Sequence, residues 1–177
     1  VLFGGSGGGG GSGDGVLNGK GGGAGFKVNV KSGIIDINGT INVTGMPGAG
    51  ANDQDTGAGG GGSGGHVILI GKTINVSLAK IDISGGNGGS AGTVGDDCAG
   101  GGGGGGRIVF VYQNLTNNTV SINSGGGAAG TPNGCVNGPG AGSAGSVFWN
   151  STTADWPDVE PPLVTIISPT AGQNFSV

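Results

Sequence analysis

Residues 57–70 read GAGGGGSGGHVILI and residues 100–111 read GGGGGGGRIVFV, so in both places a glycine run passes directly into an apolar stretch rich in Val and Ile. This junction occurs four times, in segments whose starts are 40, 41 and 39 residues apart: residues 25–30, 65–70, 106–111 and 145–150. A regular spacing of this size is typical of repeat architectures. The sequence therefore predicts stacked units of about forty residues.

The composition limits the class of protein. Glycine supplies 50 of the 177 residues, whereas charged residues make up 9% and aromatic residues 5%. Glycine loses more conformational freedom on folding than any other residue and weakens helices. We therefore exclude an ordinary globular enzyme and a helix bundle, and we predict a chain without α-helix.

The apolar half of each unit has the period of a β-strand. Residues 33–45 alternate between apolar and polar side chains, with the apolar ones from Ile35 to Val43 on one parity. A similar alternation starts at Ile41, Ile81 and Val120, which are 40 and 39 residues apart. This pattern, interrupted by turn residues, predicts short strands with one buried face.

Two stretches, 67–70 and 108–112, are apolar on both parities. Such strands are typical of sheets that are covered on both faces. We expect the glycine-rich halves of the units to cover them.

The glycine-rich halves also have internal order, since each contains two glycine runs around a polar tip. The halves are residues 4–25, 45–65, 84–106 and 124–145, and the tips are residues 14–20, 51–56, 93–98 and 131–137. Each half predicts a hairpin of two extended legs in the polyproline II conformation, with about three residues per turn and a rise of about 3.1 Å per residue. Legs without side chains can pack through their backbone N–H and C=O groups. Flexible linkers are the alternative interpretation.

These patterns together predict an all-β fold. Repeats of about forty residues combine short β-strands with glycine-rich polyproline II or polyglycine II hairpins, stacked as a sandwich or a short solenoid, with no α-helix. The chain divides into a glycine-rich repeat domain (1–150), a Pro-containing linker (151–162) and a C-terminal β-strand segment (163–177).

The runs at 60–70, 81–89 and 101–110 resemble the glycine-rich repeats of microbial cell-surface or filament proteins, archaeal ones included. They are also similar in kind to the polyglycine-II domains of certain phage receptor-binding adhesins and of a receptor tyrosine kinase ectodomain. The resemblance covers residues 1 to about 150. It implies an architecture and no shared functional residues.

Residues 163–177 resemble the first strand of an immunoglobulin-like domain. One strand alone is not a domain. Two interpretations follow: the chain continues into a larger protein, or this strand completes the sheet of a neighbouring subunit by strand addition. Strand addition would produce a homo-oligomer or a filament.

Asn-X-Ser/Thr triplets are more numerous than the roughly two that chance supplies at this composition, and each is an acceptor signal for N-linked glycans. They begin at Asn38, Asn42, Asn75, Asn114, Asn117, Asn150 and Asn174. Asn42 and Asn75 lie on the polar parity of their strands, so a glycan there would point away from the apolar face. The alternative is that Asn and Thr are common in turns and at strand edges. Glycosylation predicts an extracellular protein, at the cell surface or secreted.

The two cysteines support this location. Cys98 and Cys135 lie in successive polar tips, 37 residues apart against a unit of about forty. A disulfide between them is the expected interpretation, with metal ligation or a free thiol as alternatives.

Side chains suited to catalysis or metal binding are scarce. The single His66 stands at a unit position that holds Phe26, Arg107 and Ser146 elsewhere, so we expect no catalytic residue and no enzyme. Tip carboxylates are candidate calcium ligands, with solvated turn residues as the alternative. They are Asp14, Asp53, Asp55, Asp96 and Asp97.

The charge balance and hydropathy exclude further partners. Six scattered basic residues against ten acidic ones, for a net charge of −4, predict no nucleic-acid site. No apolar run is long enough to span a membrane.

We therefore expect a non-catalytic structural protein, a subunit or module of a surface fibre joined by its C-terminal strand. A carbohydrate- or receptor-binding adhesin that presents the polar tips is the main alternative. An ice-binding protein would need a regular face of Thr or small residues, and no strict Gly-X-X spacing supports one. A polysaccharide-cleaving solenoid would need two carboxylates flanking a groove, whereas the acidic residues here lie mostly in the polar tips.

Overall fold

The computed structural model describes residues 5–11, 19–51, 57–92, 98–116, 119–135 and 138–153. Within these ranges the chain forms β-strands and no helix. The long strands are β1 (Lys27–Asp36), β3 (His66–Asn75), β5 (Arg107–Thr116) and β7 (Ser146–Ser151); the short ones are β2 (Thr40–Asn42), β4 (Lys80–Asp82) and β6 (Ser121–Asn123).

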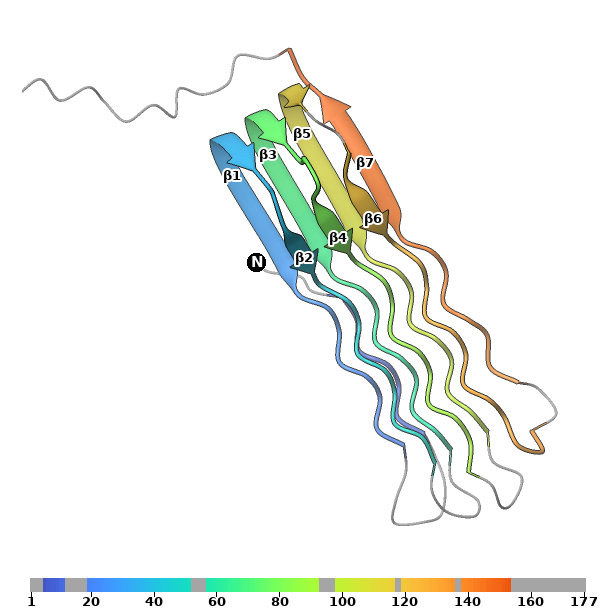
Figure 1. Ribbon diagram of the computed structural model, residues 1–177. Coiled ribbons are helices and arrows are strands. Elements are labelled where there is room, and N and C mark those ends of the chain that lie inside the picture. The colour runs from blue at the N-terminus through green and yellow to red at the C-terminus, as the bar shows by residue number, and fades with distance from the viewer. Residues whose placement is uncertain are drawn as a thin grey trace, which may run out of the picture.

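The strands form two parallel sheets. One has the order β1-β3-β5-β7 and the other β2-β4-β6. After each of the first three long strands the chain turns back into a short strand, so one pass adds a strand to each sheet (Figure 1). We call one long strand with the short strand that follows it a pass. Each pass lies beside the previous one, so neighbouring strands in each sheet come from successive passes.

The long strands extend further than their sequence indicates. The sequence marks a leading segment at 25–30 and an apolar stretch at 67–70, but β1 and β3 continue past Gly33 and Gly71. At Gly71 an added Cβ would lie only 3.0 Å from Ile74 Cγ1 and 3.2 Å from Ile35 Cδ1. The missing side chain leaves room for these core side chains, so glycine here permits packing instead of ending the strand.

The register of β1 differs by one residue from the sequence alignment. We aligned Phe26 with His66, whereas the structure pairs Lys27 with His66 and therefore Val28 with Val67. A shift of one residue moves every side chain to the other face of a sheet. The observed register turns Val28 toward the core, where it packs against buried residues, and leaves Phe26 outside at 76% exposure.

The short strands also differ from the alignment. Ile81 pairs with Ile122, not with Val120 as expected, and Ile41 pairs with Ile81 as the spacing predicts. Val120 and Ile122 are two residues apart and both pack against the core, so the pairing differs but the predicted core-facing side does not. The observed pairing places Asn42, Asp82 and Asn123 in one row across the sheet.

The core lies between the two sheets. Its buried side chains come from both sheets and the turns that join them: Ile35, Val43, Val67, Leu69, Ile74, Val76, Ala79, Ile81, Ile83, Ile108 and Phe110. The expectation that glycine-rich halves cover the strands is wrong, because the second sheet covers one face and the glycine segments extend beyond the strand ends (Figure 1). On the other face Ile68, Ile70, Val109 and Val111 are only half-buried.

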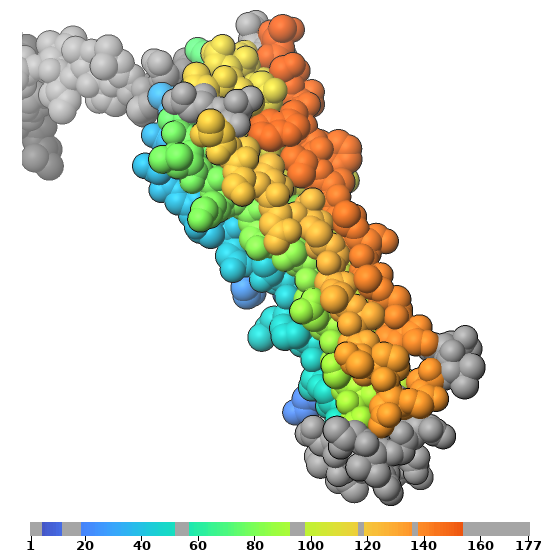
Figure 2. Space-filling view, turned by 45° about the vertical axis from the view of Figure 1, so that its right-hand side comes forward, coloured from blue at the N-terminus to red at the C-terminus, as the bar shows by residue number. Residues whose placement is uncertain are grey.

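The glycine segments run side by side below the sheets. We call the segments that lead into long strands ascending legs 1 to 4: residues 19–25, 57–65, 98–106 and 138–145. Those that follow short strands are descending legs 1 to 3, residues 43–51, 84–92 and 124–131, and residues 5–11 form the N-terminal leg. The legs and strands make an elongated body in which each pass runs lengthwise beside the next (Figure 2).

Hydrogen bonds between the legs repeat every three residues. In ascending leg 2, successive N–H groups donate in turn to descending leg 1, the N-terminal leg and ascending leg 3. The bonds are Gly59 to Ala49, Gly60 to Gly9, Gly61 to Gly101, Gly62 to Met46, Ser63 to Ser6 and Gly64 to Gly104, with N···O distances of 2.8–2.9 Å. Each leg is therefore bonded in several directions, unlike a strand, which is bonded in one plane.

Close approach, not backbone strain, explains the glycines of the legs. Gly134 is the one glycine with positive φ among the described residues, and it lies outside the legs. A Cβ added at Gly61 would collide with the carbonyl group of Gly86, whereas one at Gly60 would meet only atoms of Gly9 and Gly101 at 3.5–3.6 Å. Some leg positions are thus closed to side chains and others are open.

Asp82 links two passes. Its Oδ1 accepts hydrogen bonds from the Ser84 backbone N–H (3.0 Å) and hydroxyl (2.7 Å), and its Oδ2 accepts one from Asn123 Nδ2 (3.1 Å). Burial by itself would raise the pKa of Asp82, but the hydrogen bonds from Ser84 and Asn123 outweigh it and hold the pKa below its usual value.

A depressed pKa makes Asp82 a source of acid sensitivity. Its contribution to stability is present above the pKa of the unfolded chain, about 3.9, and is lost as pH falls through the lower folded pKa. We expect the free energy of unfolding of Asp82→Asn to fall less steeply below about pH 4 than that of the parent chain. Denaturant titrations across that range measure the slope; identical slopes would contradict the prediction.

Candidate functional site

The stack of strands has two open ends. In the described part of the chain, β1 and β7 each pair with one neighbour only. Ser146 and Thr152 donate their N–H groups toward β5, to Gly106 and Tyr112. Because N–H groups alternate in direction along a strand, those of Val147, Trp149 and Ser151 point to the open side. An open edge of this kind can accept a further strand.

Aromatic side chains build the β7 end. Trp149 stacks on Phe110 with a centroid distance of 3.9 Å and an interplanar angle of 3°, and Arg107 lies 4.4 Å from the centroid of Phe148. Phe110 is fully buried, whereas Trp149 and Phe148 are 41% and 45% exposed. β7 thus offers backbone donors beside large apolar surfaces, which suits a protein contact.

The sequence analysis did not single out this aromatic group. Phe110 and Trp149 occupy the same position in the segments 106–111 and 145–150, and the structure pairs them directly. Alignment of the two segments could therefore have predicted the contact between Phe110 and Trp149, because parallel in-register strands bring equivalent positions together.

Cys98 and Cys135 are joined in a disulfide with a Cα–Cα distance of 5.3 Å. It connects the base of ascending leg 3 to the segment that precedes ascending leg 4. The chain's cysteines are all paired, so no free thiol is available for metal binding.

The candidate calcium ligands Asp14, Asp53, Asp55, Asp96 and Asp97 lie outside the described residues. Within the described ranges, no group of three or more His, Cys, Asp or Glu side chains could hold a metal ion. His66 stands in β3 between Lys27 of β1 and Arg107 of β5, in a row of basic residues.

The predicted glycan acceptors are distributed over the strand half of the molecule. Asn38, Asn42, Asn114 and Asn150 are exposed, and Asn75 is half-buried. The side-chain oxygens of Asn42 and Asn75 accept hydrogen bonds from Thr44 and Ser77 two residues on. Asn117 and Asn174 lie outside the described residues, as do the C-terminal segment 163–177 and most of the linker.

Comparisons with protein-family models, with curated proteins and with solved structures find no match to this chain. Among the residues that the structure describes, no helix is long and apolar enough to cross a membrane.

Proposed function

We propose that this chain is an extracellular structural protein, a subunit or module of a surface fibre with no catalytic role. The observation that carries the proposal is the open edge of β7, whose outward backbone donors have no acceptor among the described residues and lie beside half-exposed aromatic side chains. A soluble monomer usually covers or blunts such an edge. We infer that a strand of a neighbouring subunit completes the sheet here.

The material of this fibre is a polyglycine II lattice in a short solenoid of forty-residue repeats. Three observations support the assignment: the legs bond in three directions with a period of three residues, their glycines avoid positive φ, and close backbone contacts exclude side chains. These are the properties of packed polyproline II helices. Flexible linkers would have no reason for such a bonding pattern.

The extracellular location rests on two observations. The disulfide between Cys98 and Cys135 suits an oxidising compartment. Exposed Asn side chains of the glycosylation triplets are accessible to a transferase at Asn38, Asn42, Asn114 and Asn150. N-linked glycans on a fibre would add solubility and cover its surface.

The C-terminal segment 163–177 is the proposed joining strand. It is apolar and extended in its sequence pattern, and its addition to β7 of another subunit would be a head-to-tail contact. A head-to-tail contact that does not close into a ring produces an open filament.

The β7 edge can be tested with one proline. Ser151→Pro removes an N–H group that points to the open side, and Ser151 is exposed, so the bonds to β5 remain. We expect the parent chain to form fibres by negative-stain electron microscopy and sedimentation, and Ser151→Pro to remain as short particles. Thr152→Ala is the control, because it also removes the Asn150 glycosylation triplet but keeps the edge donors. Fibres of normal length from Ser151→Pro would contradict the proposal.

A carbohydrate- or receptor-binding adhesin is the second candidate. The observation in its favour is that the leg ends that flank the polar tips lie together at the end of the molecule away from the strands (Figure 1). Loops on a rigid scaffold are common binding sites. Monodisperse particles that retain binding to a cell surface would favour this function over the fibre.

A further inference from the structure

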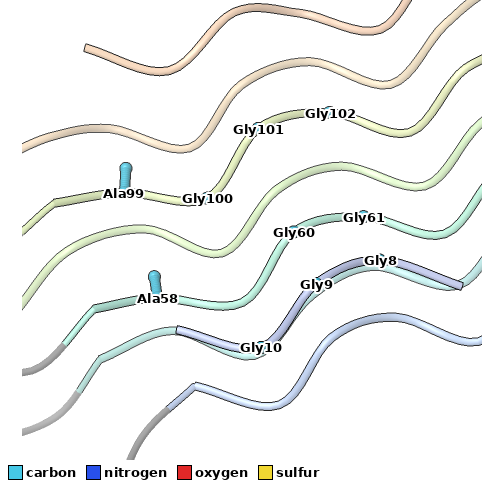
Figure 3. A pocket seen from close by; sticks show the side chains of 10 residues that line it. All are labelled: Gly8, Gly9, Gly10, Ala58, Gly60, Gly61, Ala99, Gly100, Gly101 and Gly102. Carbon is cyan, nitrogen blue, oxygen red and sulfur yellow. The ribbon is translucent and has the colours of Figure 1, made fainter. Parts of the chain in front are cut away.

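A shallow groove of about 420 Å³ runs along the glycine lattice on the side opposite the descending legs. In Figure 3, Gly8 to Gly10 of the N-terminal leg form one wall, and residues of ascending legs 2 and 3 form the rest. No side chain larger than alanine lines the groove. A molecule that binds here must therefore recognise the protein backbone.

Ascending leg 3 directs backbone donors into the groove. Its residues Gly101 and Gly104 are the counterparts of Gly60 and Ser63 in ascending leg 2, which donate their N–H groups to the N-terminal leg. The N–H groups of Gly101 and Gly104 have no acceptor among the described residues. They point to the equivalent place in the lattice, which is the groove.

The N-terminal leg directs donors into the groove from the other side. Its carbonyl groups at Ser6 and Gly9 accept from ascending leg 2. In descending leg 2, which runs in the same direction, such a residue accepts from one neighbour and donates to the adjacent one: Gly86 accepts from Gly103 and donates to Gly62. Ascending leg 1 already receives other donors of the N-terminal leg, so the N–H groups of Ser6 and Gly9 point into the groove, where no described residue accepts them.

Ascending leg 2 contributes acceptors between these two rows of donors. Its carbonyl groups take three directions in turn, since Gly60 accepts from ascending leg 1 and Gly59 accepts from descending leg 2. The remaining third faces the groove and has no donor among the described residues: Ala58, Gly61 and Gly64. All three rows repeat every three residues, which is the period of a polyproline II helix.

The three rows fit one more leg of the lattice. A leg in this place would accept from the N-terminal leg and from ascending leg 3, and it would donate to ascending leg 2. Antiparallel and parallel legs are both neighbours in this lattice, so either chain direction satisfies the rows. Each bond contributes little in water, and binding therefore requires a segment long enough to form several together.

Close approach determines which sequences fit. Around ascending leg 2, a Cβ points toward the neighbours that donate to it: at Gly59 it would collide with Lys20 of leg 1, and at Gly61 with Gly86 of descending leg 2. A leg in the groove would receive donors from the N-terminal leg and from ascending leg 3. Two of its three Cβ directions are therefore closed, and the third faces solvent.

The N-terminal leg follows the same rule. A Cβ at Gly8 would collide with the carbonyl group of Gly60, whereas a Cβ at Gly9 would meet no atom within 4 Å. Ser6, the one residue of this leg with a side chain, has the same place in the three-residue period as Gly9. A segment that fits the groove should therefore read Gly-Gly-X, with X toward solvent.

We propose that the groove binds a Gly-Gly-X segment of another polypeptide as an additional polyglycine II leg. The partner is defined by its backbone, because four N–H groups and three carbonyl groups meet it and two of every three residues must be glycine. This contact attaches a second glycine-rich chain to the side of the molecule. It does not use the β7 edge and does not depend on the proposed fibre.

A soluble peptide tests the proposal. We expect acetyl-(Gly-Gly-Ser)4-amide, added at saturating millimolar concentration to isotope-labelled Ser151→Pro protein, to slow amide exchange at Gly101 and Gly104 at least about tenfold by NMR. Gly62, which already donates to Met46, is the internal reference and should not change. Acetyl-(Gly-Ala-Ser)4-amide is the control, because in every register it places a Cβ in a closed direction. The dilute parent chain should respond as Ser151→Pro does.

Gly60→Gln provides the blocking variant. A Cβ at Gly60 has open contacts of 3.5–3.6 Å to Gly9 and Gly101, so the side chain extends into the groove without disturbing the single chain. We expect it to weaken binding of the Gly-Gly-Ser peptide at least about tenfold. Gly39→Gln, at an exposed glycine with no atom within 4 Å of the added Cβ, should leave binding unchanged.

Four outcomes would overturn the proposal. Exchange at Gly101 and Gly104 that stays rapid with the Gly-Gly-Ser peptide would show that the groove holds only water. Equal slowing by the Gly-Ala-Ser peptide, or slowing that Gly60→Gln does not weaken, would show that peptides bind elsewhere. Slow exchange without peptide would show that the groove is already filled, by a second copy if the exchange depends on protein concentration and by the same chain if it does not.

Discussion

Gly61→Ala is expected to destabilise the protein by about 3 kcal/mol, the upper part of the usual range for overpacking. Gly61 is buried in ascending leg 2, and a Cβ there would collide with the carbonyl oxygen and carbon of Gly86 in descending leg 2. Backbone atoms cannot rotate away as a side chain can. The two legs would have to separate, and the hydrogen bonds from Gly86 to Gly62 and from Gly61 to Gly101 would lengthen together.

Gly60→Ala is the matched control one residue away. Its Cβ would make ordinary contacts with Gly9 and Gly101, and Gly60 does not have positive φ. Replacing glycine by alanine at such a position reduces the entropy of the unfolded chain, so we expect a gain of about 0.4–1 kcal/mol. Denaturant titration of the two variants measures whether each substitution lowers or raises the free energy of unfolding.

The comparison separates a lattice from flexible linkers. Linkers would respond alike to alanine at positions 60 and 61, because neither residue would have fixed neighbours. Equal effects from the two substitutions would therefore refute the packed arrangement of the legs. Slow amide exchange at Gly62, which donates to Met46, should accompany a large difference between the variants.

The strands, and a described chain without helix, could be predicted because both depend on short-range patterns of glycine and of alternating apolar residues. The register could not be predicted fully. Phe26 and His66 both follow a glycine, yet the inward parity of Val28 decides which residues pair. An alternating pattern divides the side chains of a strand between two faces, but which residue pairs with which is known only once the neighbouring strand is placed.

The shallow groove that is lined by Gly8 to Gly10 and by residues of ascending legs 2 and 3 could not be predicted either (Figure 3). It exists because residues 5–11 lie between ascending legs 1 and 2, whereas no described segment lies in the same layer between ascending legs 2 and 3, and this depends on the path of the chain. Residues 100–106 of ascending leg 3 are all glycine, and nothing in this run distinguishes Gly101 from Gly102. Hydrogen-bond direction in a three-dimensional lattice makes that distinction.

Phe110→Ala is expected to lower the free energy of unfolding by about 3–5 kcal/mol, as is usual for a buried phenylalanine. Phe110 is fully buried in β5, where it packs in the core and carries the stacked ring of Trp149. The substitution leaves a cavity between the sheets and removes the support of β7. The edge of β7 that we propose as the joining surface should therefore be lost together with stability.

Phe148→Ala is the control for this prediction. Phe148 is the neighbour of Trp149 in β7, but its ring is 45% exposed and contacts Arg107 on the outer face. Since the substitution removes little buried apolar area, we expect the free energy of unfolding to fall by less than about 1 kcal/mol. Denaturant titration followed by tryptophan fluorescence measures both variants, because Trp149 should become more solvent-exposed in Phe110→Ala alone. A cost for Phe148→Ala as large as that for Phe110→Ala would mean that the outer face of the long sheet, and not the space between the sheets, is the main core.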